Sequence, residues 1–194
     1  MQTWKHSECQ QNESWKYTKG RGGVVWNNNT VVISKSKIED YFQDKSITDN
    51  CIIIDESSIK LIGPVTGNIC FSRCPKKGWK NMWYGIYTGF QQIKKSISNT
   101  NNIVISFRFD YFDVPESRTI SQENIILFIK NNLRTTNIMF IQNKLGCDNL
   151  MMAPYRKIKN LIKKFHFNLE TITNTNKNIR HQEYLVKIIA KQYN

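Results

Sequence analysis

Short apolar runs alternate along the chain with segments in which apolar residues recur every three or four positions. The first pattern is typical of buried β-strands and the second of amphipathic helices. Apolar runs predict strands at residues 51–55, 58–63, 102–107 and 138–142. Helical spacing predicts helices at residues 35–43, 81–97, 122–132, 154–167 and 181–192. Strands that alternate with helices predict an α/β domain with a mostly parallel sheet flanked by helices.

Several of these predicted helices carry a recognisable start signal. Either Ser34 or Ser36 can cap the first helix, and Ser121 directly precedes the apolar positions of the helix at 122–132. Serine is favoured at the N-cap because its hydroxyl accepts a hydrogen bond from a free backbone N–H of the first turn. Pro154 stands at a suitable first helical position for the helix that follows it.

Residues 64–80 contain glycine, two prolines and no regular apolar spacing, which predicts a loop. The helix predicted after this loop has the clearest apolar stripe, formed by Met82, Ile86, Phe90, Ile93 and Ile97. The chain shows neither an internal repeat nor a long linker. A length of 194 residues therefore predicts a single domain over residues 1–194.

The chain is strongly basic, with 28 lysines and arginines against 15 acidic residues and a formal net charge of +13. The imbalance is greatest from Lys130 onward, where the only acids are Asp148, Glu170 and Glu183. Such a surface attracts polyanions, and nucleic acids, sugar phosphates and anionic membranes all fit this requirement.

The segment YRKIKNLIKKFH at residues 155–166 suggests nucleic acid in particular. Its cations fall opposite the apolar stripe, however, as they do on any surface helix. No paired zinc spacing, aromatic RNA-binding strand or phosphate-binding loop accompanies them. Nucleic-acid binding is thus open but is not the favoured interpretation at this point.

Cysteine usage and the N-terminal residues bear on location. The five cysteines are scattered, and Cys70 and Cys74 lack a second pair with zinc-ligand spacing. The first residues are polar throughout, which is unlike a secretory signal, and no apolar run approaches the ~18 residues of a transmembrane helix. We therefore expect a cytoplasmic protein that is not secreted, with reduced thiols and no transmembrane segment.

Charged residues follow the apolar run at residues 102–107, where NIVISF continues as RFDYFD. Asp110 and Asp113 are candidate ligands for a hard divalent cation such as Mn²⁺ or Mg²⁺. Arg108 is a candidate clamp for a phosphate, because its guanidinium can donate two parallel hydrogen bonds. The alternative is that Arg108 and Asp110 form an ordinary salt bridge at the end of a sheet.

Two other segments carry polar residues that fit the same site. Asp148 and Asn149 follow the strand predicted at 138–142, so in a parallel sheet they would share an edge with Asp110. His181 and Glu183 start the last predicted helix. The alternatives are a simple turn at 147–150 and, for Glu183, a favourable interaction with the helix dipole.

Aromatic residues cluster at the start of the helix predicted at 81–97, in the stretch GWKNMWYGIY. Trp83 and Tyr87 are expected to pack in the core. Trp79 lies just before the predicted helix and is the better candidate for stacking on a ligand.

Taken in order, these segments resemble a known family. The stretches GWKNMWYGIYTGFQQI, ISFRFDYF, GCDNLMMAP and HQE follow one another as in glycosyltransferase-like proteins of large DNA viruses and bacterial surface-polysaccharide clusters. The resemblance covers nearly the whole chain. It implies a GT-A-like, Rossmann-like sheet that binds a nucleotide sugar, often with Mn²⁺ or Mg²⁺, and transfers the sugar to a glycan or protein acceptor.

The resemblance also assigns roles. Arg108 and Asp110 match the family's Arg-x-Asp, Asp148 matches its later acid, and Glu183 matches its C-terminal glutamate. We expect Asp110 and Asp113 to bind the metal, and Asp148 and Glu183 to act on the acceptor. The remaining candidates for substrate binding are Arg108, Trp79, Asn149 and His181.

Two departures from the family leave a second function open. Asp110 and Asp113 are three apart, where many GT-A enzymes have Asp-x-Asp, and the chain begins as though the first strand and helix of the sheet were missing. The leading hypothesis is a glycosyltransferase. The alternative is a non-catalytic remnant of that fold or a basic module that binds nucleic acid or another polyanion.

Overall fold

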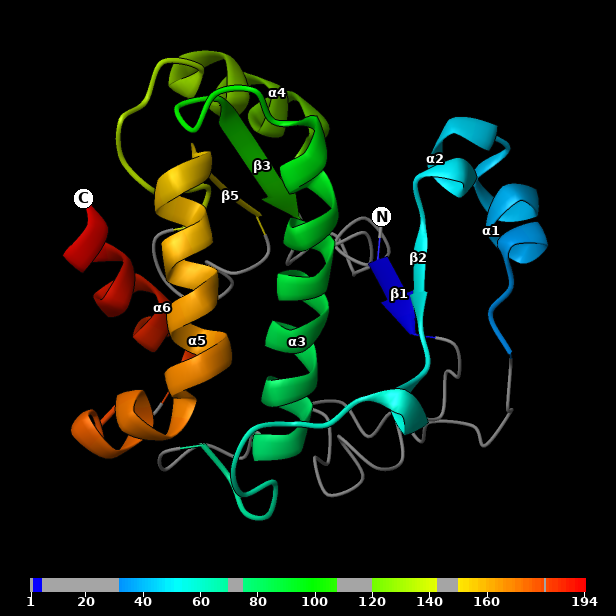
Figure 1. Cartoon of the computed structure of the whole chain (residues 1–194). Helices are drawn as coiled ribbons and strands as arrows, with labels where there is room; N and C mark the ends of the chain where they lie inside the picture. Colours follow the sequence, from blue (N-terminus) through cyan, green and yellow to red (C-terminus); the bar gives the residue numbers. More distant parts are fainter. Residues whose placement is uncertain (1, 5–31, 70–74, 108–119, 143–149, 180) are drawn as a thin grey trace.

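The computed structural model describes residues 2–4, 32–69, 75–107, 120–142, 150–179 and 181–194 (Figure 1). Its helices are α1 (Lys35–Phe42), α2 (Lys45–Asp49), α3 (Lys76–Ile93), α4 (Gln122–Asn132), α5 (Tyr155–Thr175) and α6 (Gln182–Ala190). Its strands are β1 (Gln2–Trp4), β2 (Ile52–Ile54), β3 (Ile103–Phe107), β4 (Met139–Phe140) and β5 (Leu150–Pro154). Short 3-10 helices are η2 (Glu56–Ser58), η3 (Lys94–Ser96) and η6 (Lys191–Tyr193).

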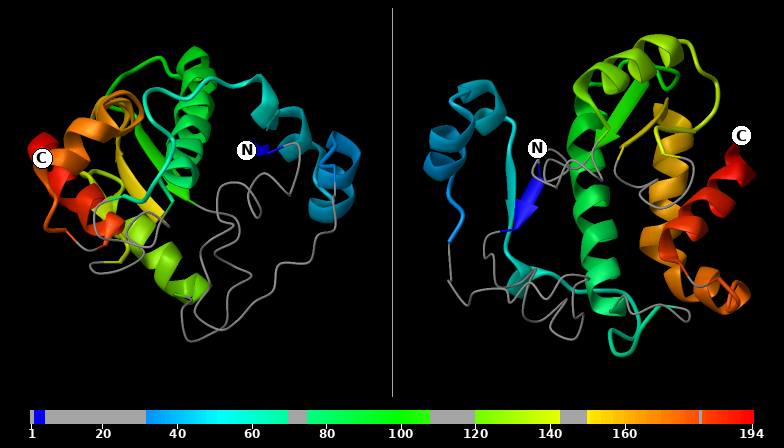
Figure 2. Two further views of the ribbon diagram at one scale, coloured as in Figure 1. Left: turned by 90° about the horizontal axis from the view of Figure 1, so that it is seen from below. Right: turned by 180° about the vertical axis from the view of Figure 1, so that it is seen from behind.

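The main sheet is small and antiparallel, with the strand order β3-β5-β4. The central strand β5 runs opposite to both neighbours, and Phe107 of β3 is the register partner of Leu150. Helices α3 and α5 lie on one face of this sheet, and α4 lies on the other (Figure 2). Every residue of β5 is buried, so the strand contributes to the core on both faces.

The predicted fold class is wrong. The protein is mainly helical, and its three-stranded sheet is antiparallel instead of the expected mostly parallel sheet flanked by helices. The error arises at residues 150–154, for which no strand was predicted. They form the central strand, which runs antiparallel to β3 and to β4. Because the GT-A-like fold requires a parallel sheet, that implication of the resemblance is also wrong.

Two further predicted elements differ from the structure. The segment at 58–63 is not a strand. Its first residue ends η2, and residues 59–63 have irregular backbone. The helix expected from residue 81 begins at Lys76, within the predicted loop. The first turn of α3 is held by the Lys76 N–H, which donates to the carbonyl of Gly67 at 2.9 Å. This contact satisfies a backbone donor that a capping side chain would otherwise serve.

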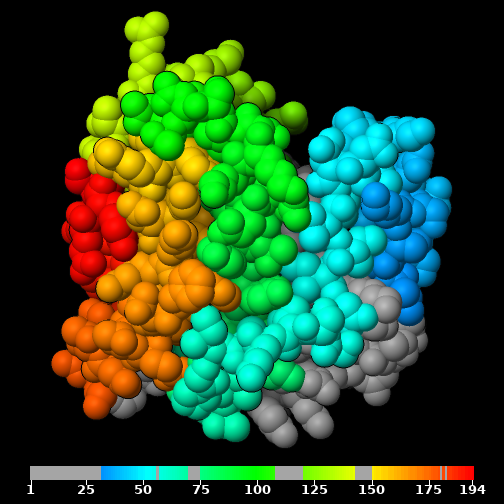
Figure 3. All heavy atoms as spheres, in the orientation of Figure 1, coloured from blue at the N-terminus to red at the C-terminus, as the bar shows by residue number. Residues whose placement is uncertain are grey.

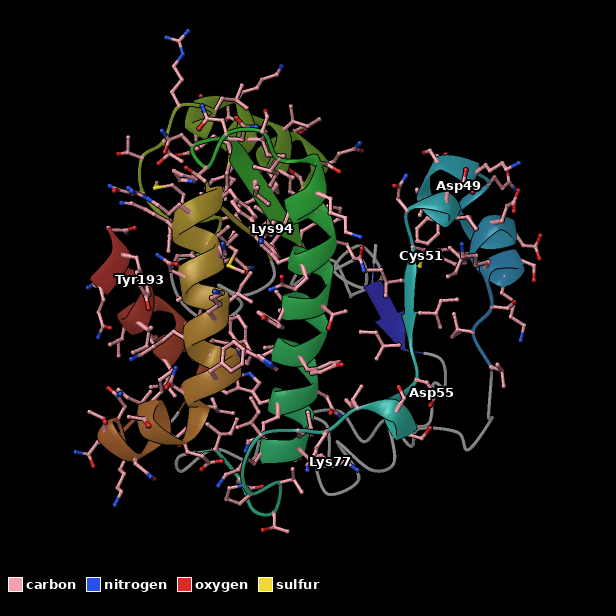
Figure 4. The ribbon with its side chains drawn as sticks, in the orientation of Figure 1. Asp49, Cys51, Asp55, Lys77, Lys94 and Tyr193 are labelled. Atoms are coloured by element: carbon pink, nitrogen blue, oxygen red, sulfur yellow. The ribbon has the colours of Figure 1, made fainter. Side chains whose placement is uncertain are left out.

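A second, smaller unit lies beside α3. Strand β1 pairs in parallel with β2, with Thr3 opposite Ile53, and α1 and α2 lie next to this pair (Figure 1). Helix α1 starts as expected, because the hydroxyl of Ser34 accepts a hydrogen bond from the N–H of Lys37. Cys51 and Asp55 flank β2 (Figure 4), and burial raises the pKa of the Cys51 thiol.

The principal core fills the space between the sheet and the helices α3, α5 and α6. Its largest fully buried members include Trp83, Phe165, Met151, Leu161 and Leu185. Trp83 and Phe165 stack with their ring centroids 4.4 Å apart and their planes 8° apart. Large aromatic rings bury much apolar area, so this stack contributes strongly to the packing of α3 against α5.

Candidate functional site

Five of the residues predicted to form a site lie outside the residues that the structure describes. They are Arg108, Asp110, Asp113, Asp148 and Asn149. The described residues next to them are neighbours, because Phe107 pairs with Leu150 and the N–H of Ile141 donates to the Leu150 carbonyl at 3.2 Å. The segments 108–119 and 143–149 are therefore joined to the same end of the antiparallel sheet.

Trp79 is a core residue. It lies inside α3, not before it, and its side chain is only 2% exposed. Its ring centroid is 6.2 Å from that of Trp83 and 5.5 Å from that of Phe165, in edge-to-face contacts. The expectation that Trp79 stands before the helix is thus wrong, and a ring with so little exposed surface has no free face for a ligand.

His181 and Glu183 lie at the start of α6, as expected. His181 is exposed at the N-cap position, and its ring centroid lies 5.9 Å from that of Tyr184. Glu183 is in the first turn of the helix, where its charge complements the helix dipole. The acceptor role of Glu183 stays a prediction.

The predicted Mn²⁺ or Mg²⁺ has no donor set in the described ranges, where His, Cys, Asp and Glu form no group of three that could hold a metal ion. The expected ligands Asp110 and Asp113 fall outside those ranges. We therefore derive no chemical step through a metal.

The structure brings two tyrosines of the aromatic stretch at 78–87 together with two rings from α5, a grouping that the sequence did not predict. Tyr84 and Tyr87 of α3 meet His166 and Phe167 of α5, and we call these four residues the aromatic surface. Tyr87 stacks on His166 with centroids 4.4 Å apart and planes 11° apart, and Tyr84 contacts the same imidazole at 5.7 Å. Phe167 stands edge-to-face against Tyr87 at 5.3 Å and against His166 at 4.5 Å.

The packing of α3 against α5 explains why these rings meet. The two helices run antiparallel, because Lys80 near the start of α3 pairs with Glu170 near the end of α5, whereas Phe90 stacks on Tyr155. The side chains of α3 and α5 are in contact on the face of the molecule shown in Figure 3, and we call this line of contact between the two helices the seam. Along this seam, rings from the middle of α3 come opposite rings from the second half of α5.

Burial makes the imidazole of His166 difficult to charge. Its half-buried position among aromatic rings lowers the pKa of His166 below the usual histidine range. Within the described part of the chain His166 makes ring contacts and no hydrogen bond. At neutral pH it is therefore a neutral, flat ring held between other rings.

Phe167 is the most exposed member of the aromatic surface. Its side chain is 46% exposed, although it touches both Tyr87 and His166. The next residue, Asn168, departs from helical backbone angles and marks a kink in α5. An exposed aromatic ring that is oriented by other rings is a surface ready for contact with a further flat group.

Cations lie near the aromatic surface along α5 and just beyond the end of α3. On α5, Arg156, Lys159 and Lys163 precede His166 and Phe167 at helical spacings that place them along one face. Lys94 and Lys95 in η3 follow the end of α3 that lies beside the start of α5. Figure 4 labels Lys77 and Lys94 near the two ends of α3.

These five cations lack ionic partners among the residues that the structure describes. Lys159 instead lies over the ring of Tyr155, with its Nζ 5.6 Å from the ring centroid. By contrast, Lys76 and Lys80 at the other end of the seam both pair with Glu170. In the described ranges, cations without ionic partners therefore lie along α5 before the aromatic surface and just beyond the end of α3.

Comparison with protein-family models, with curated proteins and with solved structures found no match for this chain. Across the described ranges, no helix combines the length and the apolar character that crossing a membrane requires.

The sequence contained part of the signal for this surface. Tyr84 and Tyr87 are three apart, and Lys159, Lys163 and Phe167 are four apart, so each set shares a helix face. The cations of this region are evident in the sequence. Tyr87 was expected to pack in the core, and its half-buried ring does pack against the core cluster. The antiparallel pairing of the two helices joins the two sets, and no pattern in the sequence reveals that pairing.

Proposed function

We propose that this protein is a basic module that binds polyanions through cations of α5 and of η3, the short helix that follows α3. The observation that carries the proposal is the group of five cations without ionic partners in the described structure, Arg156, Lys159, Lys163, Lys94 and Lys95. Cations that are not neutralised by neighbouring acids remain available for phosphate or sulfate groups. The net charge of +13 adds a long-range attraction for the same ligands.

Electrostatic binding of this kind has a measurable signature. Each phosphate that a lysine or arginine neutralises releases bound counterions, so the logarithm of the association constant falls linearly with the logarithm of the salt concentration. For single strands the slope is about −0.7 for each neutralised phosphate. We expect weak binding at physiological salt and a steep increase when the salt is lowered.

The experiment compares two triple variants of equal net charge. One replaces Arg156, Lys159 and Lys163 by glutamine; the other replaces the exposed Lys35, Lys37 and Lys45 of α1 and α2 by glutamine, and these two helices lie away from α5 (Figure 1). A labelled oligonucleotide and fluorescein-heparin are titrated by fluorescence anisotropy at several salt concentrations.

We expect the first variant to flatten the salt slope by up to about 2 for the oligonucleotide, and the second to change it little. If both variants weaken binding equally, net charge and not this face determines binding. If the parent protein binds neither ligand at low salt, the proposed function is wrong.

Glycosyl transfer is a second candidate. The supporting observation is the pairing of Phe107 with Leu150, because the segments carrying Arg108, Asp110 and Asp148 join the described fold at this one end of the sheet. The test is a thermal-shift screen of nucleotide sugars with and without Mn²⁺. Stabilisation by one donor that requires metal and is lost in Asp110→Asn would support the transferase; a flat screen would reject it.

A further inference from the structure

We propose that Phe167, the exposed ring of the aromatic surface, stacks on the bases of single-stranded nucleic acid whose phosphates are held by the neighbouring cations. The inference rests on the proposed polyanion-binding function and names its ligand. It combines two features of one helix face, namely the exposed ring of Phe167 and the cations Lys159 and Lys163 that precede it on α5.

Phe167 is the residue on which the inference chiefly depends. Burial of its ring in the core would remove apolar area from water, yet 46% of the side chain remains exposed. Contacts with Tyr87 at 5.3 Å and with His166 at 4.5 Å restrict the orientation of the ring. Stacking of a base on a ring that is already held in place costs less conformational entropy than stacking on a mobile side chain, because the side chain does not have to be ordered on binding.

The chemistry of the surrounding rings suits an uncharged flat ligand group. His166 is neutral at physiological pH because burial lowers its pKa, and it is fixed against Tyr87 by a near-parallel stack. Tyr84 adds a further ring to the same group. Every base has a flat face, so the exposed ring of Phe167, held by these uncharged rings, can stack on bases with little sequence preference.

The position of the cations separates a nucleic acid from an uncharged sugar. Lys159 and Lys163 lie seven and three residues before His166, which is roughly 10 Å and 5 Å along a helix at ~1.5 Å per residue. Phosphates of a strand whose bases reach the rings therefore fall within range of these side chains. Neutral glycans would use the rings but would leave the cations without a counterpart.

A single strand fits better than a duplex for a physical reason. Bases in a duplex are stacked on one another, so their faces are hidden from a protein side chain. Duplex DNA would engage the cations but not the aromatic surface. Bases of an unpaired strand are free to stack on aromatic rings, and each such contact strengthens binding about tenfold or more.

The experiment uses pairs of ligands with equal backbone charge. Oligo-dT and an abasic oligonucleotide of the same length are titrated into the full chain at low salt by fluorescence anisotropy. The variant is Phe167→Leu, which keeps an apolar side chain but removes the flat ring. The matched control is Tyr41→Leu, which removes an exposed ring on α1, a helix that lies away from α5 (Figure 1).

We expect oligo-dT to bind the parent protein about tenfold more tightly than the abasic strand. Phe167→Leu should remove most of this difference, and Tyr41→Leu should preserve it. Melting temperatures close to that of the parent would show that both variants are folded. For a variant that melts early, His166→Gln provides a second test of the same difference.

The outcomes separate this inference from the function on which it rests. If oligo-dT, the abasic strand and heparin all bind with similar affinity, the polyanion-binding function stands and the base-stacking inference is wrong. Equal effects of Phe167→Leu and Tyr41→Leu would also reject the stacking role. If none of the three ligands binds, the proposed function itself is wrong.

Discussion

The Nζ of Lys80 lies 2.8 Å from Oε1 of Glu170, and this ion pair joins α3 to α5 at one end of the seam. Lys80 is only 6% exposed. Its ammonium group also donates to the carbonyl of Pro64 at 2.7 Å and to the carbonyl of Ile62. Gly63 between them adopts a left-handed backbone with φ of 67°, which presents both carbonyls to one lysine. A single buried cation therefore holds three segments together.

Lys80→Met should destabilise the protein. The substitution keeps an unbranched side chain but leaves Glu170 with only Lys76, and it removes the donor for two carbonyls. Because Glu170 is partly exposed, we expect a loss of about 2–4 kcal/mol in the free energy of unfolding, somewhat below the cost of breaking a fully buried pair. Urea unfolding measures this loss.

The control for that substitution is Lys45→Met, at an exposed position on α2. It should change the free energy of unfolding by less than about 0.5 kcal/mol. If the two variants lose similar amounts of unfolding free energy, the contacts of Lys80 do not stabilise the fold as proposed.

The same ion pairs predict a loss of stability in acid. Burial by itself would raise the pKa of Glu170, but its hydrogen bonds and charge interactions with Lys80 and Lys76 outweigh burial and lower the pKa below the usual glutamate value. A carboxylate with a lowered pKa stabilises the folded state above its unfolded-state pKa. This contribution disappears as the pH falls through the folded-state pKa.

Glu170→Gln should therefore show a smaller fall in the free energy of unfolding than the parent as the pH drops below the ordinary glutamate pKa. Chemical unfolding at a series of acidic pH values measures the difference. Parallel curves for the two proteins would contradict the lowered pKa.

The lowered pKa of His166 leads us to expect a second pH dependence of the free energy of unfolding, at higher pH than that of Glu170. Burial lowers the pKa of His166, so the unfolded chain binds a proton at a pH where the folded protein does not. The free energy of unfolding should fall as the pH decreases from the ordinary histidine pKa to the folded-state value. Unfolding measured at a series of pH values that descends through the ordinary histidine pKa, which is about 6.5, follows this change. In His166→Gln the fall should be smaller than in the parent, and an unchanged fall would assign the effect to another group.

Two phenylalanines of α5 provide a matched test of core against surface. Phe165 is 1% exposed and stacks on Trp83, whereas Phe167, two residues later, is 46% exposed. Phe165→Ala should cost about 3–5 kcal/mol of unfolding free energy because it opens a cavity in a closely packed core. Phe167→Ala should cost less than about 1 kcal/mol. Thermal and urea unfolding of both variants checks this, and a large cost for Phe167→Ala would make that ring structural.

The local signals in the sequence were sufficient for some elements and not for others. Helix α4 has the predicted bounds 122–132, and its N-cap Ser121 accepts a hydrogen bond from the Asn124 N–H. Ser34 caps α1 in the same way. Capping depends on residues three positions apart, so it is visible in sequence. The start of α3 has no side-chain cap and depends on the distant Gly67 carbonyl, which no local pattern could show.

The candidate site shows the same division. Sequence alone identified the basic character of the chain, the cations of α5 and the aromatic helix that became α3. The predicted strand-end residues Arg108, Asp110 and Asp148 remain a prediction. The aromatic surface required the antiparallel pairing of α3 and α5, since Tyr87 and His166 are 79 positions apart in the chain.

Sequence by itself determined which segments are apolar, where helices α1 and α4 begin and how much positive charge the protein carries. These properties depend on neighbouring residues or on composition. Tertiary structure alone decided that residues 150–154 form the central strand and that this strand runs antiparallel to its neighbours. The physical reason is that a strand is stabilised by hydrogen bonds to partners remote in sequence. A short apolar run before a helix therefore has no fixed direction until those partners are in place.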